Sequence, residues 1–233
     1  MKRLLLLITA IVSIGIAQAQ DSTAFKAILC RFEVPRAESG SEYGAGFIIA
    51  RQGDTLFLVT AGHVLRDRIP DRPVPVLLGE SKDTLKAEVV LCHDPKVDQR
   101  EDLAICRVIA PRVFVPKIPF AQLPTRVPVF YYHKTDLKIE TGGGEQELIT
   151  LNLSQHAYQI YLPELPPGDS GGPVFTLRPI PQLIGMILRG DAACDVLQIS
   201  HILTIIQQEM PMLMGKLMLS NEKIPYPAAV AAH

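Results

Sequence analysis

The chain has 233 residues, of which 48% are apolar and 20% charged, a composition typical of a folded globular protein rather than a disordered one. Lysine and arginine (23 residues) nearly balance aspartate and glutamate (24), so the net charge of −1 provides no field that would hold the phosphates of a nucleic acid. Tryptophan is absent and aromatic residues are only 6%, which argues against a platform for stacking single-stranded bases. The 19 prolines and 16 glycines favour many short strands over a few long helices.

The first 19 residues predict a secretory signal peptide. Lys2 and Arg3 precede an apolar run from Leu4 to about Ala17, which is shorter than the roughly 20 residues that a membrane-spanning helix needs. Ala17-Gln18-Ala19 then places small residues at the two positions that signal peptidase reads. The alternative is an uncleaved anchor. No later apolar run reaches membrane-spanning length, so we expect an exported protein, periplasmic or secreted, without a membrane span.

Short apolar segments separated by turn residues predict strands along most of the chain. In the first half they are residues 25–34, 46–50, 55–60, 74–79, 85–92 and 103–109. In the second half they are residues 129–133, 137–140, 147–153, 157–162, 172–177 and 183–188, with a turn at the glycines 142–144. Residues 196–209 show helical spacing, and Pro211 ends this predicted helix.

A proline-rich stretch divides the two sets of strands. Five prolines within residues 111–128 exclude a helix or a central strand and predict a linker. The sequence therefore predicts an all-β chain of two small antiparallel β-barrels with a C-terminal helix. The expected organisation is a signal peptide at 1–19, an N-terminal barrel at 20–110, the linker at 111–128, a C-terminal barrel with the terminal helix at 129–210, and a tail at 211–233.

The chain has four cysteines, at positions 30, 92, 106 and 194. Export would permit disulfides, and four cysteines allow three complete pairings. Cys30, Cys92 and Cys106 each lie in an apolar stretch, so the sequence leaves two alternatives open: buried small hydrophobic residues, or one disulfide among these three. CxxC spacing does not occur, and we expect neither a metal site nor a cofactor.

Three short motifs carry the chemistry. TAGHV places His63 just after an apolar strand, EDLAI places two carboxylates just before one, and PGDSGGP places Ser170 among glycines in a tight loop. A serine hydroxyl must lose a proton as it attacks, a histidine can take that proton and pass it to a leaving amine, and a carboxylate holds the imidazole in the right tautomer. Glycines beside the serine let backbone N–H groups point at a developing oxyanion, and Gly168 and Ser170 are the expected donors.

In this order, TAGHV, DLAI and GDSGGP resemble the motifs of the trypsin/chymotrypsin-like serine proteases, with Tyr43–Phe47 similar to the segment before the catalytic histidine strand in bacterial members. The resemblance covers residues 25–209 and implies two antiparallel six-stranded barrels. It implies His63 as general base, Asp102 as the carboxylate that orients it, and Ser170 as nucleophile. Glu101 is a competing carboxylate, but Asp102 directly precedes Leu-Ala-Ile, as the motif requires.

The expected function is that of an exported serine endopeptidase, which acts on a peptide or protein substrate through an acyl-enzyme. The alternative is a non-catalytic or latent binding or scaffold protein on the same fold. The sequence leaves the oligomeric state open.

The chain also departs from the family pattern. An Ile-Val-Gly-Gly-type start, whose amine pairs with the aspartate before the nucleophile in animal zymogens, is not found near residues 20–35, so Asp169 has no partner of that kind. The substrate-aligning strand reads Leu188-Arg189-Gly190 instead of a Ser-Trp-Gly-like sequence, which removes one expected support of Asp102. The disulfide that braces the specificity pocket is missing, because Pro166 stands where a partner of Cys194 would be.

Substrate specificity stays open at the level of sequence. The resemblance places Glu164, six residues before Ser170, at the floor of the specificity pocket and Arg189 and Gly190 on its wall. A carboxylate at the floor would select lysine or arginine, whereas Arg189 would neutralise it or select acidic side chains. Leu165 beside Glu164 would instead make a small or apolar pocket.

Overall fold

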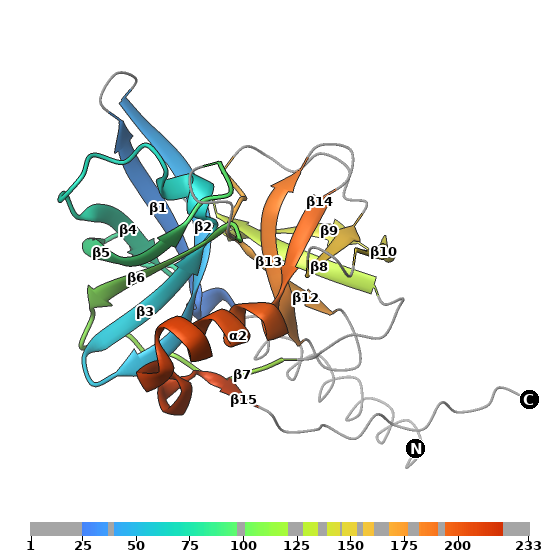
Figure 1. Ribbon diagram of the computed structural model, residues 1–233. Helices are drawn as coiled ribbons and strands as arrows, with labels where there is room; N and C mark the ends of the chain where they lie inside the picture. Colours follow the sequence, from blue (N-terminus) through green and yellow to red (C-terminus); the bar gives the residue numbers. More distant parts are fainter. Residues whose placement is uncertain are drawn as a thin grey trace, which may run out of the picture.

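The computed structural model describes residues 25–36, 40–96, 101–120, 128–134, 139–144, 146–152, 156–160, 168–176, 182–190 and 194–220. The predicted signal peptide therefore lies outside the described residues. Figure 1 shows two groups of strands side by side, β1–β6 on one side and β8–β14 on the other, with helix α2 near one end. Within the part of the chain that the structure describes, no helix combines the length and the hydropathy that crossing a membrane requires.

The first group is a closed antiparallel barrel in the order β1-β2-β3-β6-β5-β4. Its strands are β1 (Leu29–Arg36), β2 (Gly40–Gln52), β3 (Thr55–Thr60), β4 (Val74–Leu78), β5 (Thr84–His93) and β6 (Leu103–Ile109). In β4 every second residue is buried, as expected for a strand with one face on a core. β2 and β5 each contain an irregularity, at Ile48/Ala50 and Val89/Leu91, and such bulges let a strand bend around a small barrel.

The second group is a seven-stranded antiparallel sheet in the order β10-β11-β14-β13-β12-β8-β9. Its strands are β8 (Pro128–Lys134), β9 (Ile139–Gly144), β10 (Gln146–Asn152), β11 (Ala157–Ile160), β12 (Pro173–Thr176), β13 (Leu183–Gly190) and β14 (Cys194–Gln198). β10 also pairs with β8, through Gln146–Val129 and Glu147–Pro128, so the sheet curls back on itself. The all-β prediction is confirmed, and the first barrel is closed with the expected six strands. The second unit is a seven-stranded sheet rather than the expected six-stranded barrel, and among the described residues β8 and β10 pair through these two residue pairs.

Three predicted local structures are wrong. Residues 25–27, predicted as the start of a strand, are helical, and β1 begins only at Leu29. Glycines 142–144 are not a turn but part of β9, where the neighbouring Thr141 pairs with Tyr132 of β8. Cross-strand pairing here overrides the weak strand preference of glycine. Residues 196–198 are not helical but belong to β14, which lies between β11 and β13 and pairs with both. Helix α2 therefore comprises Ile199–Glu209.

The segment after α2 packs on the first barrel. It contains the 3₁₀ helix η3 (Pro211–Lys216) and strand β15 (Leu219–Ser220), which pairs in parallel with β7 (Ile118–Pro119). The Met218 N–H donates to the Ile49 carbonyl at 2.8 Å, and the Ile118 N–H donates to the Met218 carbonyl at 2.8 Å. The first ten residues of the predicted tail thus belong to the folded body, and residues 221–233 lie outside the described residues.

The two units share one apolar core. Buried side chains of the first barrel, of β12–β14 and of α2 form a single cluster, and the rings of Phe25 and Phe175 meet within it at 4.8 Å between centroids. All four cysteines are free, with Cys30, Cys106 and Cys194 buried and Cys92 half-buried. The alternative of a disulfide among the first three is therefore wrong, and these residues act as small apolar side chains.

Candidate active site

His63 lies in a tight turn that directly follows β3. The 3₁₀ helix η1 (Gly62–Leu65) buries Gly62, Val64 and Leu65 and leaves the His63 side chain 29% exposed. A Cβ added at Gly62 would lie 1.8 Å from the His93 carbonyl oxygen, so only glycine fits where the turn passes the end of β5. Packing of the turn against β5 thereby determines where His63 emerges.

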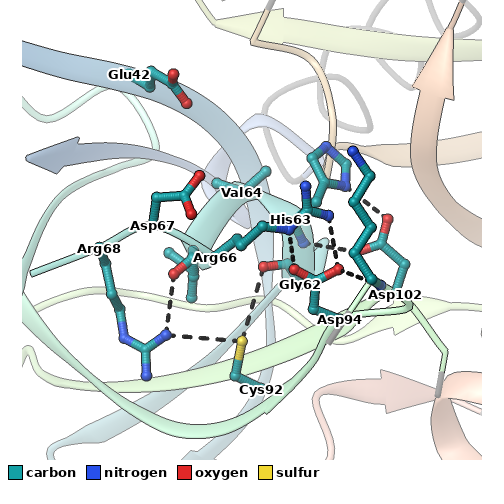
Figure 2. Close-up of polar contacts among 12 residues, drawn as sticks. Glu42, Gly62, His63, Val64, Arg66, Asp67, Arg68, Cys92, Asp94 and Asp102 are labelled. Atoms are coloured by element: carbon teal, nitrogen blue, oxygen red, sulfur yellow. Dashed lines mark hydrogen bonds and ion pairs between the residues drawn. The ribbon is translucent and has the colours of Figure 1, made fainter. Parts of the chain in front are cut away.

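Asp102 is brought to His63 by strand register. Thr60 of β3 pairs with Ala104 of β6, which places the residue before β6 next to the turn that follows β3. The Asp102 Oδ2 atom lies 2.6 Å from His63 Nδ1, and the His63 backbone N–H donates to Asp102 Oδ1 at 2.8 Å (Figure 2). One carboxylate therefore holds both the ring and the backbone of the histidine, with Nδ1 as donor and Nε2 left as acceptor.

The Ser170 loop lies against the same end of the first barrel. The Ala45 N–H donates to the Ser170 carbonyl at 2.9 Å, and the Gly171 N–H donates to the Ile187 carbonyl of β13 at 2.7 Å. Gly171 has a φ of +90°, and a Cβ there would lie 2.3 Å from both the Ala45 carbonyl oxygen and Thr60 Oγ1. The loop of the second unit is thus pressed on Thr60, three residues before His63.

The residues before the serine complete the loop. Gly168 has a φ of +97°, a backbone conformation that favours glycine, and lies beside Tyr43 of β2. Asp169 is only 4% exposed, and its carbonyl accepts a hydrogen bond from the Gly172 N–H at 2.9 Å. Burial, with the added charges of Asp195 and Asp169, raises the pKa of Cys194 to about 12, so Cys194 stays a neutral thiol beneath the loop.

No protein-family model and no curated protein sequence matches the chain. Solved structures do match it. The serine endoprotease from Yersinia pestis aligns with a TM-score of 0.61 and 16% identity, over 84% of this chain and 67% of that one. The Rv3671c protease from M. tuberculosis aligns in its active form with a TM-score of 0.58 and 22% identity, over 84% of this chain and 83% of that one. Its inactive form aligns with a TM-score of 0.56 and 20% identity, over 82% of this chain and 94% of that one.

This chain has the chymotrypsin-like all-β fold. The active and inactive forms of the Rv3671c protease match it almost equally, so the overall fold does not distinguish a competent site from a latent one. In this chymotrypsin-like arrangement His63 and Asp102 come from the first barrel and Ser170 from a loop of the second unit.

An ion pair that the sequence analysis missed supports the histidine turn. The Arg66 N–H donates to the His63 carbonyl at 3.3 Å, and the Arg66 guanidinium contacts both oxygens of Asp94, one of them at 2.7 Å. The Asp94 side chain is 5% exposed, and hydrogen bonding to Arg66 lowers its pKa although burial opposes the shift. Arg66 and Asp94 are 28 residues apart, so no local sequence pattern could predict the ion pair.

Cys92 and Arg36 also brace the turn, and Figure 2 shows the contacts of Cys92. The Cys92 Sγ lies 3.8 Å from the Gly62 carbonyl oxygen and 3.9 Å from an Arg68 nitrogen, and burial is the main cause that raises the pKa of this thiol. On the other side, the Arg36 side chain is 7% exposed, pairs with Glu42 and donates to the Val64 carbonyl at 3.4 Å. The turn that carries His63 is therefore held from both sides.

The other candidate residues of the site contact different partners in the part of the chain that the structure describes. Glu101 contacts His201 of α2 rather than His63. Glu164 lies outside the described residues, while Arg189 and Gly190 lie in β13, paired with Asp195 and Cys194 of β14. The three specificity alternatives stay predictions. Among the described residues, no group of three or more histidine, cysteine, aspartate or glutamate side chains is arranged to hold a metal ion.

Proposed function

We propose that the protein is an exported serine endopeptidase in which Ser170, His63 and Asp102 hydrolyse peptide bonds. One observation carries the proposal: the Ser170 loop packs on Thr60 and Ala45, beside a histidine whose Nδ1 faces an aspartate at 2.6 Å. The Ser170 loop of the second unit and the His63–Asp102 pair of the first barrel thus lie together at the end of β3.

The chemistry follows from the tautomer that Asp102 selects. With the Nδ1 proton donated to Asp102, the His63 Nε2 atom accepts the Ser170 hydroxyl proton as Oγ attacks the peptide carbonyl carbon. The Gly168 and Ser170 N–H groups would stabilise the oxyanion, a contribution of about 100- to 1000-fold per donor in comparable sites. His63 then gives the proton to the leaving amine, and water releases the acyl group by the same steps in reverse.

Reaction with a fluorophosphonate probe tests the proposal, because it requires an activated serine but no knowledge of the substrate. Protein expressed from Gln20 should be labelled directly, with the label located on Ser170 by mass spectrometry. Ser170→Ala or His63→Ala should abolish labelling, and either should lower turnover by up to about a millionfold once a substrate is found. Folded protein that never reacts would favour the latent or binding alternative. Labelling only after a defined N-terminal cut would show that activation is needed.

Export and specificity are separate parts of the proposal. The export prediction rests on residues 1–19, and the mass of the protein recovered outside the cytoplasm should correspond to a chain beginning at Gln20. A peptide-library cleavage profile decides between the pockets. Cleavage after lysine or arginine that is lost in Glu164→Gln would support a basic preference, whereas cleavage after small or apolar residues, unchanged by that substitution, would remove Glu164 from the site.

A further inference from the structure

An ionic contact joins the two units one residue away from Asp102. The Oε1 atom of Glu101 lies 2.9 Å from Nε2 of His201, a residue of α2 whose side chain is 14% exposed. The Glu101 side chain thereby reaches a buried ring nitrogen of α2. Glu101 and Asp102 are therefore neighbouring carboxylates directed to different partners.

A second histidine fixes the ring of the first. The His156 and His201 rings stack at 4.0 Å between centroids with only 6° between their planes. His156 has a φ of +52°, which is uncommon for a residue other than glycine, and its carbonyl accepts a hydrogen bond at 3.0 Å from the Gln198 N–H at the start of α2. His201 is thus held by its own helix and by the residue that directly precedes β11.

The charges explain why such a contact matters. Burial alone would raise the pKa of Glu101, but its own backbone N–H and the nearby His201 and His156 lower it below its ordinary value. Glu101 is therefore ionised at neutral pH beside the Asp102 carboxylate, and it is directed to Nε2 of His201 rather than to His63. Without the contact to His201, the Glu101 side chain would lose one of the interactions that hold it in place. The backbone of Glu101 leads directly into Asp102, so its position affects that of Asp102.

We propose that Glu101, His201 and His156 form an inter-unit clasp that positions Asp102 against His63. Docking of α2 on the first barrel then sets the geometry of the histidine–carboxylate pair. These three are positioning residues, since they act through Asp102. The catalytic consequence rests on the proposed function, but the positioning itself does not.

The first test measures probe kinetics in clasp variants. His201→Gln and Glu101→Gln should each lower kinact of the fluorophosphonate reaction about tenfold and leave KI within about twofold, because a misplacement of 1 Å can cost about 100-fold in rate and only one support is removed. The double variant should be no slower than either single variant. His201→Lys, which gives Glu101 a charged nitrogen donor, should recover part of the rate. Thr204→Ala, on the exposed side of the same helix, is the matched control and should react like the wild type.

The second readout is the proton NMR signal of His63 Nδ1–H, which reports the contact with Asp102 whether or not the protein hydrolyses anything. It should move or broaden in His201→Gln and Glu101→Gln. If the wild type never reacts with the probe but this signal moves in the variants, the clasp stands and the proposed function fails. If the wild type reacts while kinact and the signal stay unchanged in both variants, or if only the folded fraction falls, the clasp is wrong. Glu101, with 37% of its side chain exposed, provides the variant least dependent on folding.

Discussion

Among single residues, Gly171 determines the conformation of the Ser170 loop because it has no Cβ atom. Gly171 combines a φ of +90° with contacts in which a Cβ would come within 2.3 Å of Ala45 and Thr60. Backbone strain and overlap therefore act together at the position right after the proposed nucleophile. Neither effect can be relieved without moving the loop away from the end of β3, because the overlapping atoms belong to the barrel.

Gly171→Ala should displace the loop and lower the rate of probe labelling at least 100-fold, the scale expected for a displacement of about 1 Å. The free energy of unfolding should fall by about 2–4 kcal/mol, from strain and overpacking together. Gly40→Ala is the control, since Gly40 has a similar φ of +82° but open space around it. That variant should lose only about 1 kcal/mol and keep its labelling rate. Equal effects of the two variants in urea denaturation and probe kinetics would contradict the steric argument.

Among the elements, the turn after β3 is held by an ion pair with the residue that follows β5. Asp94 follows β5 and is nearly buried, and its partner Arg66 ends the turn that carries His63. Glu88 and Arg107 also form an ion pair at 2.7 Å, from β5 to β6, but both side chains are more than half exposed. One pair involves a residue of β5 and the other the residue that follows β5, and the pairs differ in burial, so they separate the effect of burial from that of charge.

Asp94→Asn should lower the free energy of unfolding at pH 7 by about 1–3 kcal/mol, because it leaves the Arg66 charge without its carboxylate. The folded-state pKa of Asp94 is depressed, so its contribution is present above the unfolded value of about 3.9 and is lost as the pH falls through the lower folded value. The difference between wild type and variant should therefore shrink below about pH 4. Glu88→Gln is the control and should cost about 0.5 kcal/mol or less. Urea denaturation at several pH values measures both, and a difference independent of pH would contradict the assignment.

At the scale of the whole molecule, the C-terminal segment joins the first barrel to the body. η3 and β15 bury Leu213 and Leu219, and Met218 makes backbone hydrogen bonds to both β2 and β7. This segment follows α2, which also packs on β13 and β14, so the chain after β14 contacts both units. Stability and the relative placement of the units are therefore linked through residues far from the site.

A chain that ends at Met210 should be less stable than the full chain by about 4–6 kcal/mol, from the loss of two buried leucines and two backbone hydrogen bonds. That is a large share of the stability of an ordinary domain, so part of the population should be unfolded at 37 °C. A chain that ends at Ser220 keeps all of these contacts and is the control. Thermal unfolding followed by circular dichroism measures the difference. Equal midpoints for the two truncated chains would show that the segment contributes nothing.

Features that depend on residue type and short spacing could be predicted from the amino-acid sequence. Apolar segments bounded by turn residues predicted β3 and β6 to the residue, because alternation and turn chemistry are local properties. The order of TAGHV, EDLAI and PGDSGGP predicted which side chains to examine, since a proton acceptor, a carboxylate and a serine between glycines are chemically recognisable in one dimension.

Features that depend on contacts between residues far apart in the chain could be seen in the tertiary structure alone. Residues 196–198 became strand rather than helix because two neighbouring strands pair with them. Of two adjacent carboxylates, Asp102 meets His63 while Glu101 meets His201, a separation that depends on how the two units dock. Arg66 and Asp94 form an ion pair although 28 residues separate them in the chain, because the fold brings them together. Helical spacing, a pair of acidic residues and an isolated arginine each permit several local outcomes, and long-range pairing and burial select among them.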